Sequence, residues 1–463
     1  MKIILGAGLA GLSAGFDLTD HNESTLILEK GGDVGGLART HSYNGFRFDL
    51  GGHRFITRDE EVETLVKELL AEECLDVPRK SAIYFKDRFF DYPLKPGNAV
   101  FGLGLSTTLK IIKDYLYERV KNVVSPSDIV SLEDWVVGRF GRKMFELYFK
   151  KYSEKVWGID CSDISQEWVS QRISGLSLWQ AAKKALFRFS GKGIDTLADR
   201  FIYPRTGIGE ISERLKSRVL RTGEILTNAE VLKVRHSSWR IESVVFREGP
   251  DLIEEHADSV ISTIPLDCMI RALDPAPPDD ILHAISHLHY RDLIVVALML
   301  DRSSVTDLNW LYLPESKIPV GRIHEPKNWS GLMAPEDKTH IVAEYFCFRN
   351  DPTWNSGDEI LTGITLDTLE KLNFIGKGDY MDSCVVRVPR AYPLLDTTYR
   401  KYYELVLGYI SKFDNLEIAG RGGTFQYLNM DHAIRSGLEA ARRSRSADHM
   451  RCNNVIAAKE GLR

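Results

Sequence analysis

The glycine turn near the N-terminus has the residue types and spacing that hold the diphosphate of a dinucleotide. Residues 6–11 read GAGLAG, between the buried-strand pattern of Lys2–Leu5 and the helical pattern of Leu9–Leu18. Glycines at these positions allow a tight turn, approach of the backbone to a pyrophosphate and close helix–strand packing. Glu29 ends the next apolar run, Thr25–Leu28, and can accept from ribose hydroxyls. The predicted nucleotide contacts are Gly6, Gly8, Ala10, Gly11, Glu29 and Lys30.

A second glycine pair favours FAD over NAD. Residues 35–39 read GGLAR, and in flavoproteins such a pair lets the backbone pass the phosphates closely. Ser259–Pro265 (SVISTIP) is similar to the later strand that returns to the nucleotide in the same class. No second GxGxxG turn indicates a separate nicotinamide-nucleotide domain. We therefore expect FAD contacts from Gly36, Leu37, Arg39 and the backbone of Val231, although Val231 fits a core strand position equally well.

The segment from Gly420 to His432, GRGGTFQYLNMDH, is the most specific pattern of the chain. A strand pattern ends at a glycine-rich turn, and the helix predicted from Met430 directs the positive end of its dipole toward the bound cofactor. With this segment the chain resembles the monoamine-oxidase-like flavoproteins, which include protoporphyrinogen oxidase, phytoene desaturase and UDP-galactopyranose mutase. The segment itself resembles the mutase signature. The resemblance implies flavin contacts for Arg421, Leu428, Asn429 and Met430.

Five further parts of the chain resemble the mutases in the same order. Asp49–Phe55 (DLGGHRF) is similar to the loop that borders the flavin, and Tyr152–Gly158 (YSEKVWG) to a segment of the nucleotide-sugar pocket. Arg172 has the spacing of a diphosphate-binding arginine in eukaryotic mutases. Gly321–Lys327 and Ala391–Leu394 resemble segments that supply an arginine and a tyrosine. The resemblance implies site roles for Gly51, Gly52, His53, Tyr152, Trp157, Arg172, Arg322, Tyr392 and Tyr427.

The chemistry that this resemblance implies is a non-redox use of FAD. N5 of the reduced flavin would attack the anomeric carbon of a nucleotide-diphosphate sugar, the diphosphate would leave, and the sugar ring would open and reclose at another hydroxyl. Guanidinium forks suit a diphosphate because they bind phosphate oxygens bidentately. Arg172, Arg322, Tyr392 and Tyr427 would hold the leaving group, with His53 beside the flavin. No metal-ligand cluster or Ser/His/Asp arrangement is present in the sequence.

Most of these residues also have a purely structural interpretation. Arg172 fits a surface or helix-pairing arginine equally well. Trp157 and the three tyrosines fit core aromatic residues with bonded polar groups. His53 is less typical of a core histidine, because two glycines precede it where a backbone could meet a flat ring.

Departures from the mutase pattern leave the substrate open. Gly423 and Phe425 replace residues that are usual in bacterial mutases, and Asn429 stands where those enzymes carry aspartate. The length of 463 residues is intermediate between the bacterial and eukaryotic enzymes. The sugar and the nucleotide base are therefore not fixed, and a TDP-deoxysugar fits nearly as well as UDP-galactose.

Two other functions share the same architecture. An FAD-dependent amine or protoporphyrinogen oxidase is the main alternative; its substrate pocket would be apolar or aromatic and would not need Arg172 and Arg322 together. A binding protein similar to the Rab GDP-dissociation inhibitors is the third, and the intact glycine turn and Glu29 argue against it.

Composition limits the class of protein. The formal net charge of −5 argues against a nucleic-acid-binding protein. Six scattered cysteines without a Cys-x-x-Cys pair indicate reduced thiols. No apolar run is long enough to span a bilayer. We therefore expect a cytoplasmic protein without a membrane span. The resemblance implies an enzyme with a nucleotide-sugar substrate, and a homodimer is one option.

The fold class expected is α/β: a Rossmann-type FAD-binding domain, an inserted helical domain and a second mixed or antiparallel β-sheet substrate domain. Residues 1–80, 201–265 and 401–445 are assigned to FAD binding, 81–100 and 266–400 to the sheet domain, 101–200 to the helical insertion and 446–463 to a frayed tail. Helices are predicted at Glu60–Leu70 and Met430–Arg442. A hairpin is predicted at Ser81–Tyr92, and strands at Phe46–Leu50, Leu226–Val234, Arg240–Phe246, Ser259–Ile264, Leu293–Leu300, His340–Phe348 and Leu416–Ile418.

Overall fold

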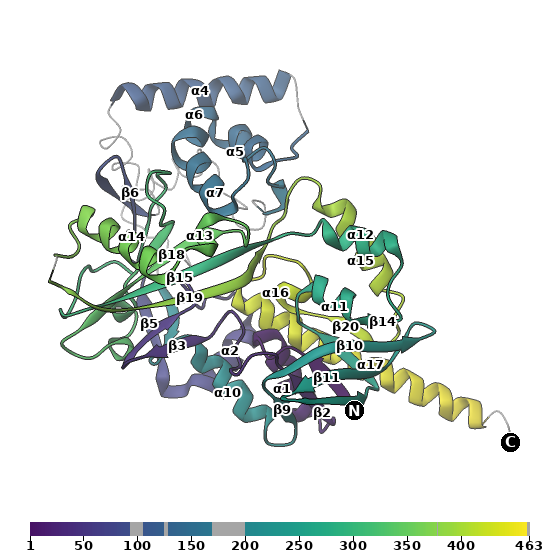
Figure 1. Ribbon diagram of the computed structural model, residues 1–463. Helices are drawn as coiled ribbons and strands as arrows, with labels where there is room; N and C mark the ends of the chain where they lie inside the picture. Colours follow the sequence, from purple (N-terminus) through teal and green to yellow (C-terminus); the bar gives the residue numbers. More distant parts are fainter. Residues whose placement is uncertain (93–104, 125–127, 169–199, 377, 461–463) are drawn as a thin grey trace.

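The computed structural model describes residues 1–92, 105–124, 128–168, 200–376 and 378–460, with side chains described to residue 446. Within these residues a five-stranded, a four-stranded and a seven-stranded sheet are accompanied by two two-stranded ribbons. Figure 1 shows the five-stranded sheet at one end of the molecule and a group of helices at the other. The predicted α/β class is confirmed, whereas the domain limits stay a prediction.

The five-stranded sheet is parallel and has the order β20-β13-β1-β2-β9. Its three central strands are buried throughout, as expected of a sheet covered on both faces. Helix α1 packs on this sheet and contacts α10 and α17. The elements are β1 (Lys2–Leu5), α1 (Leu9–Asp20), β2 (Thr25–Leu28), α10 (Gly209–Val219), β9 (Glu224–Leu226), β13 (Ser259–Ser262), β20 (Leu416–Ile418) and α17 (Met430–Glu460).

The seven-stranded sheet has the order β19-β15-β18-β17-β16-β6-β7 and joins segments that lie far apart in the sequence. Strand β6 pairs with β16 in parallel, and the other neighbours are antiparallel. Its strands are β6 (Ser81–Phe85), β7 (Arg88–Tyr92), β15 (Tyr290–Leu300), β16 (Trp310–Tyr312), β17 (Arg322–His324), β18 (Thr339–Cys347) and β19 (Tyr380–Pro393).

The four-stranded sheet and the two ribbons complete the strands of the described residues. The sheet has the order β12-β11-β10-β14, with β14 parallel to β10. The strands are β10 (Ala229–Ser237), β11 (Arg240–Glu248), β12 (Asp251–His256) and β14 (Leu273–Asp274), and the ribbons are β3 (Thr40–Tyr43) with β4 (Phe46–Asp49) and β5 (Cys74–Pro78) with β8 (Arg200–Pro204).

The helical end of the molecule in Figure 1 is built from the stretch predicted as an insertion. Its helices are α4 (Leu105–Val124), α5 (Leu132–Phe140), α6 (Arg142–Met144), a π-helical turn at Phe145–Phe149 and α7 (Lys150–Trp157). The other α-helices described are α2 (Glu60–Leu70), α11 (Leu266–Ala272), α12 (Asp279–Ser286), α13 (Pro352–Asn355), α14 (Asp358–Lys371), α15 (Tyr399–Ile410) and α16 (Gly420–Gly423).

Two predicted elements were wrong in their extent. The single strand expected at Leu226–Val234 is two strands, β9 and β10, in different sheets. Asn228 separates them with a left-handed φ of 57°, and its N–H donates to the carbonyl of Gly31 over 2.9 Å. The end of the last helix, expected at Arg442, is also wrong, because α17 continues to Glu460. The first part of this extension is held by ion pairs.

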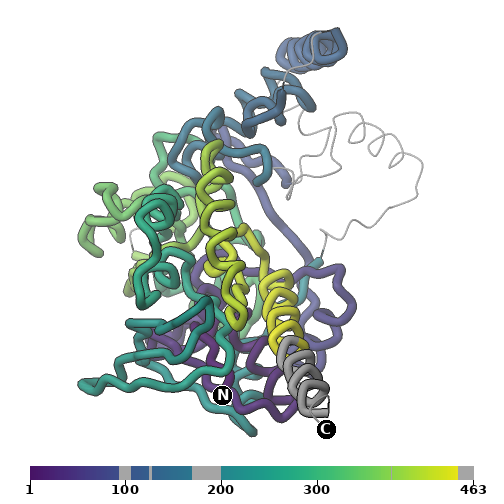
Figure 2. Tube along the Cα trace, turned by 90° about the vertical axis from the view of Figure 1, so that its right-hand side faces the viewer, coloured from purple at the N-terminus to yellow at the C-terminus, as the bar shows by residue number. Residues whose placement is uncertain are grey.

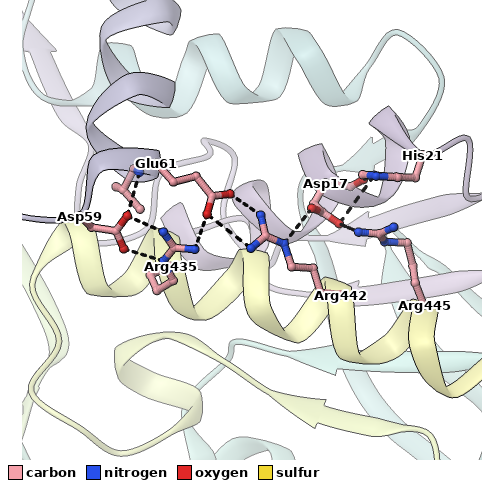
Figure 3. Close-up of polar contacts among 8 residues, drawn as sticks. Asp17, His21, Asp59, Glu61, Arg435, Arg442 and Arg445 are labelled. Carbon is pink, nitrogen blue, oxygen red and sulfur yellow. Dashed lines mark hydrogen bonds and ion pairs between the residues drawn. The ribbon is translucent and has the colours of Figure 1, made fainter.

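Arginines on α17 pair with carboxylates on α1 and α2 (Figure 3). Arg435 binds Asp59 bidentately and Glu61 over 2.6 Å, and Arg442 also pairs with Glu61. Arg445 reaches Asp17 on α1 over 2.8 Å. Because partners are shared, these pairs form a network, which is worth more than isolated surface pairs. The network fixes α17 on the helical layer that covers the nucleotide-binding sheet.

Asp49, at the end of β4, joins three separate segments through one buried carboxylate. The hydroxyls of Thr40 and Tyr203 donate to it over 2.6 and 2.7 Å, and the N–H of Ile208 donates over 3.1 Å. Burial raises the pKa of Asp49 from 3.8 to about 6, against the opposing effect of these three hydrogen bonds. The strand that leads into Gly51 and Gly52 is therefore anchored by a group that titrates above its ordinary range.

Replacing Asp49 by Asn is expected to change how stability depends on pH. Because the folded-state pKa of Asp49 is raised from 3.8 to about 6, its contribution is fully present below 3.8 and is lost as the pH rises through 6. Relative to wild type, Asp49→Asn should gain up to about 3 kcal/mol of unfolding free energy between about pH 4 and pH 7. Urea unfolding of the FAD-loaded proteins measures this difference. The exposed Asp251→Asn control should show no such trend, and a pH-independent difference for Asp49→Asn would contradict the account.

Candidate functional site

The turn between β1 and α1 has the geometry of a diphosphate cradle. A side chain at Gly11 would lie 1.9 Å from the carbonyl oxygen of Gly6, so only glycine lets the helix approach the strand this closely. No side chain caps the N-terminus of α1, where Gly8 is the N-cap residue. The first-turn N–H groups of such a helix are suited to an anion. These features fit the diphosphate of FAD.

Glu29 lies at the tip of β2, directly beside this turn. Its carboxylate accepts hydrogen bonds from the N–H groups of Ala7 and Gly31, both over 2.8 Å. Lys30 extends away and pairs with Glu230 over 2.7 Å, next to Val231 on β10. The carbonyl of Glu29 also accepts from Ala229 over 2.8 Å. The predicted nucleotide contacts Glu29, Lys30 and Val231 thus lie together.

The second glycine pair lies against the first turn. Gly35 forms a parallel bridge with Gly8, and a side chain at Gly36 would approach the Cα of Gly8 to 3.2 Å. Leu37 packs on a hydrophobic cluster that includes strands of the seven-stranded sheet. Arg39 lies near His41, whose pKa is lowered by burial and by this guanidinium. The structure thus brings the predicted contacts of this segment beside the cradle.

The loop after β4 is held by a carboxylate from the seven-stranded sheet. The N–H of Gly52 donates to Glu344 over 3.1 Å, and a side chain at Gly51 would meet the same carboxylate at 3.3 Å. His53 folds back so that Nδ1 lies 3.1 Å from the carbonyl of Gly51. Burial, with the nearby charge of Arg421, lowers the pKa of His53 to about 4. His53 is therefore neutral at neutral pH.

Glu344 forms a buried ion pair with Arg322. The two residues are cross-strand neighbours on β18 and β17, and Arg322 Nε donates to Glu344 Oε1 over 2.8 Å while Nη2 binds the second oxygen. Burial alone would raise the pKa of Glu344, but the charge of Arg322 and the contact with His324 hold it below the usual range. The Glu344 side chain is 0% exposed and that of Arg322 19%, so the pair faces outward only through the arginine.

Two aromatic residues, Tyr152 and Tyr392, lie near this ion pair, and two more pack against Tyr392. The rings of Tyr392 and Tyr427 stack at 5.7 Å with an interplanar angle of 4°. Trp157 meets both edge-on, at 6.2 and 6.0 Å. Tyr152 packs edge-on against Tyr312, the cross-strand neighbour of Arg322. The structure therefore brings together aromatic residues that the sequence places more than two hundred positions apart.

Phe346 connects the ion pair with the aromatic cluster. It lies two residues after Glu344 on β18, 5.8 Å from the Arg322 guanidinium carbon and 6.1 Å from the Tyr392 ring. Burial raises the pKa of Tyr392 to about 12, and burial also raises the pKa of Tyr152. Both phenols are therefore protonated hydrogen-bond donors at neutral pH. The indole N–H of Trp157 is buried and makes no hydrogen bond to a described residue.

Arg421 supports the two stacked tyrosines from the C-terminal segment. Its Nε and Nη2 donate to the carbonyl of Leu428 over 2.9 and 2.6 Å, and its Nη1 donates to that of Ala391 over 3.1 Å. The guanidinium carbon lies 4.8 Å from the Tyr427 ring and 5.4 Å from the Tyr392 ring. Arg421 thus joins the two tyrosine-bearing segments. Its contact with flavin stays a prediction.

The rest of the C-terminal segment begins α17. The carbonyl of Asn429 accepts the first helical bond, from Ala433 over 2.9 Å. Met430 packs into the core that contains α1. The predicted helix start at Met430 is therefore confirmed. Arg172 lies outside the described residues, so its diphosphate role stays a prediction.

Two cations, the half-buried Lys155 and the buried Arg291, which the sequence did not single out, dock α7 on the seven-stranded part of the molecule. Lys155 Nζ donates to the carbonyls of Leu313, Glu315, Ile318 and Val320, at 2.5 to 3.2 Å. Arg291 on β15 donates to the carbonyls of Lys155 and Val156 over 3.3 and 2.9 Å, at the C-terminal end of α7. A cation there also complements the helix dipole. These contacts fix the helix that carries Tyr152 and Trp157.

Glu344 is the other residue that sequence reasoning missed, and it had a visible signal. The strand Thr339–Cys347 reads THIVAEYFC, in which Glu344 is the only acidic residue of a predominantly apolar run. A carboxylate on a buried strand needs a cationic or hydrogen-bonding partner. No local pattern, in contrast, marks Lys155 or Arg291, because their partners are carbonyls far away in the sequence.

The fold and the cradle around α1 define a flavoprotein with a Rossmann-type FAD-binding domain. The chain belongs to the flavin containing amine oxidoreductase family, whose model matches residues 9–443. FAD is the cofactor of this chain, as predicted, and the chain is a flavoenzyme of the amine oxidase superfamily. The predicted resemblance to this superfamily is confirmed.

Individual relatives differ in what they are named for. Protoporphyrinogen oxidase 2 of Arabidopsis thaliana is 23% identical over 477 residues, covering 95% of this chain and 92% of the relative. A solved structure of reduced UDP-galactopyranose mutase superposes with a TM-score of 0.81 at 20% identity, covering 95% of this chain and 94% of the other. Cyclohexylamine oxidase from Brevibacterium oxydans has a TM-score of 0.65 at 16% identity, with coverages of 97% and 99%. At these identities the structural likenesses show the fold alone.

Breaking the Arg322–Glu344 pair from one side is expected to destabilise the protein strongly. Arg322→Ala leaves the buried Glu344 carboxylate uncompensated, which costs about 3–5 kcal/mol of unfolding free energy. The double variant Arg322→Met with Glu344→Gln removes both charges. The amide oxygen of the glutamine introduced at position 344 can still accept from the N–H of Gly52. The double variant should recover most of the loss. Urea unfolding compares the proteins, and equal destabilisation of the single and double variants would show that the pair is not the anchor.

Proposed function

We propose that this flavoenzyme interconverts the pyranose and furanose forms of a nucleotide-diphosphate sugar. The observation that carries the proposal is that one partly exposed arginine, Arg322, lies close enough to the protonated phenols of Tyr152 and Tyr392 to act on their pKa values. The indole N–H of Trp157, which has no described partner, belongs to the ring cluster of Tyr392, beside the loop predicted to border the flavin. A substrate with two phosphates needs such a set of donors. The similarity in fold to UDP-galactopyranose mutase adds support.

Arg322 is suited to a diphosphate because Glu344 occupies only one edge of its guanidinium group. The Nε and Nη2 groups bind the carboxylate, whereas Nη1 makes no hydrogen bond to a described residue. The bidentate pair fixes the plane of the guanidinium before a ligand arrives, which reduces the entropy lost on binding. Glu344 is in this view a positioning residue. Arg172 would supply the second guanidinium.

The tyrosines and Trp157 would hold the leaving group and the sugar. Tyr152 and Tyr392 would donate from their hydroxyls, Tyr427 would line the pocket beside them, and the Trp157 N–H needs a partner that a substrate could provide. The reduced flavin would supply the nucleophile for the anomeric carbon. Since His53 is neutral and hydrogen-bonded to its own loop, it would shape the flavin side of the site rather than transfer a proton.

An oxidase acting on an amine or a porphyrinogen is the second candidate. The Glu344 carboxylate neutralises the charge of Arg322. A site for a diphosphate would be expected to carry a net positive charge, which this pair lacks. The parallel pair of Tyr392 and Tyr427 would also suit a flat or apolar substrate. Relatives across the whole chain include a protein named as a protoporphyrinogen oxidase.

Conversion of nucleotide sugars by the reduced enzyme tests the proposal. The FAD-loaded protein is reduced with dithionite without oxygen, incubated with a panel of UDP- and TDP-hexoses, and the products are separated by chromatography. We expect a furanose isomer of at least one sugar, formed over many turnovers with no net oxidation of the flavin. The oxidised enzyme should be inactive, because an oxidised flavin is not a nucleophile.

The same preparation distinguishes the second candidate. Steady oxygen consumption with protoporphyrinogen or a primary amine, together with no product from any nucleotide sugar, would contradict the mutase proposal and favour the oxidase. As a matched control, Arg435→Met, which alters only the α17 ion-pair network, should not change the products.

A further inference from the structure

Helix α4 differs from most surface helices because its mainly polar side faces the protein and its apolar side faces outward. The side that faces the protein is largely polar: Asp114 accepts from the N–H of Lys143 over 2.7 Å, and Asn122 donates to the carbonyl of Gly138 over 3.4 Å. Glu118 is only 6% exposed. The helix contacts α5 and α6 through this side. Its docked face is thus mainly polar, with Ile111 buried there, and most of its apolar side chains lie on the outside.

The outward face carries a continuous apolar stripe. Its residues recur at intervals of three and four, so they line one side of the helix. Leu116 is 56% exposed, Val120 63% and Val123 82%. In both views α4 is the outermost element at its end of the molecule (Figures 1 and 2). The stripe consists of Leu109, Ile112, Leu116, Val120 and Val123, with exposed Tyr117 and Val124 beside it.

Only cations flank this stripe on the described part of α4. The exposed charged residues are Lys110, Lys113, Arg119 and Lys121, whereas both acidic residues of the helix lie on the docked side. The chain as a whole has a formal net charge of −5, so the charge of this face is opposite in sign to that of the whole chain. Exposed leucine and valine bordered by lysine and arginine are characteristic of helices that lie in the interface of anionic membranes.

We propose that α4 docks this protein onto the surface of an anionic lipid bilayer. The helix would lie in the plane of the interface, with the stripe among the acyl chains and the four cations at the headgroups. Among the described helices none is long and apolar enough to cross a bilayer, which agrees with attachment from one side. The docked face would still bind α5 and α6.

The charges favour a lipid surface over a second copy of the chain. Two α4 helices packed stripe to stripe would bring their lysines and arginines together without an acidic partner on the described face. Like charges facing each other oppose association, whereas anionic headgroups neutralise them. Contact with the bilayer would also bring the helical end that includes α7, and with it Tyr152 and Trp157, toward the membrane.

Vesicle co-sedimentation of the full FAD-loaded chain tests the proposal. The probes are vesicles of phosphatidylglycerol and phosphatidylcholine in equal amounts, and vesicles of phosphatidylcholine alone, at low ionic strength. We expect binding to the anionic vesicles only. Leu116→Glu with Val120→Glu should weaken it by roughly tenfold or more, and each of Lys110→Gln and Lys113→Gln by roughly fivefold. Leu252→Glu, an exposed leucine on β12, is the matched control and should bind as wild type.

Several results would overturn the proposal. These are no binding to either vesicle, equal binding to both, or binding that survives the paired glutamate substitutions at Leu116 and Val120. If the protein self-associates without lipid, and the glutamate substitutions at Leu116 and Val120 abolish this association, the stripe binds a second copy of the chain instead. Leu116→Cys introduces a thiol to which a fluorophore can be attached. If this fluorophore is already shielded from an aqueous quencher before lipid is added, the face is covered in the free protein. An unchanged flavin absorbance spectrum confirms that each variant is folded.

Discussion

The buried ion pair between Arg322 and Glu344 is the interaction on which the candidate site depends. It joins β17 to β18, and the same carboxylate accepts from Gly52 in the loop that is predicted to border the flavin. A charge taken this far from water must keep its partner, because the unpaired state is too costly to populate. The pair therefore couples the geometry of the cofactor side to that of the arginine proposed to bind substrate.

The aromatic residues beside this pair are positioned by cations that bind backbone carbonyls. An eight-residue helix such as α7 is not stable by itself, so its placement comes from tertiary contacts. Lys155 and Arg291 supply them for Tyr152 and Trp157, and Arg421 does the same for the segments of Tyr392 and Tyr427. Long cationic side chains thus hold the short elements that carry these aromatic rings, and so fix the positions of the rings.

Local signals in the sequence predicted the nucleotide cradle, the α/β class and the start of α17 at Met430, because glycine spacing and helix periodicity act over a few residues. The convergence of Trp157, Tyr392 and Tyr427 followed only from the resemblance. Glu344 could have been found as the lone acid of an apolar strand. Lys155 could not, since its partners are carbonyls about 160 residues away. The split at Asn228 was missed because the sheet that a strand joins depends on residues outside the strand: β9 pairs with β2, and β10 with β11.

The Arg322 cluster is proposed to bind a diphosphate next to the flavin. Calorimetric titration of the FAD-loaded protein with UDP and TDP tests it most directly, with Arg322→Met/Glu344→Gln as the variant because it leaves no unpaired buried charge. We expect one saturable site in wild type, and loss of binding in the variant with an unchanged flavin spectrum. Equal affinity in the two proteins, or no binding of either nucleotide to wild type, would contradict it.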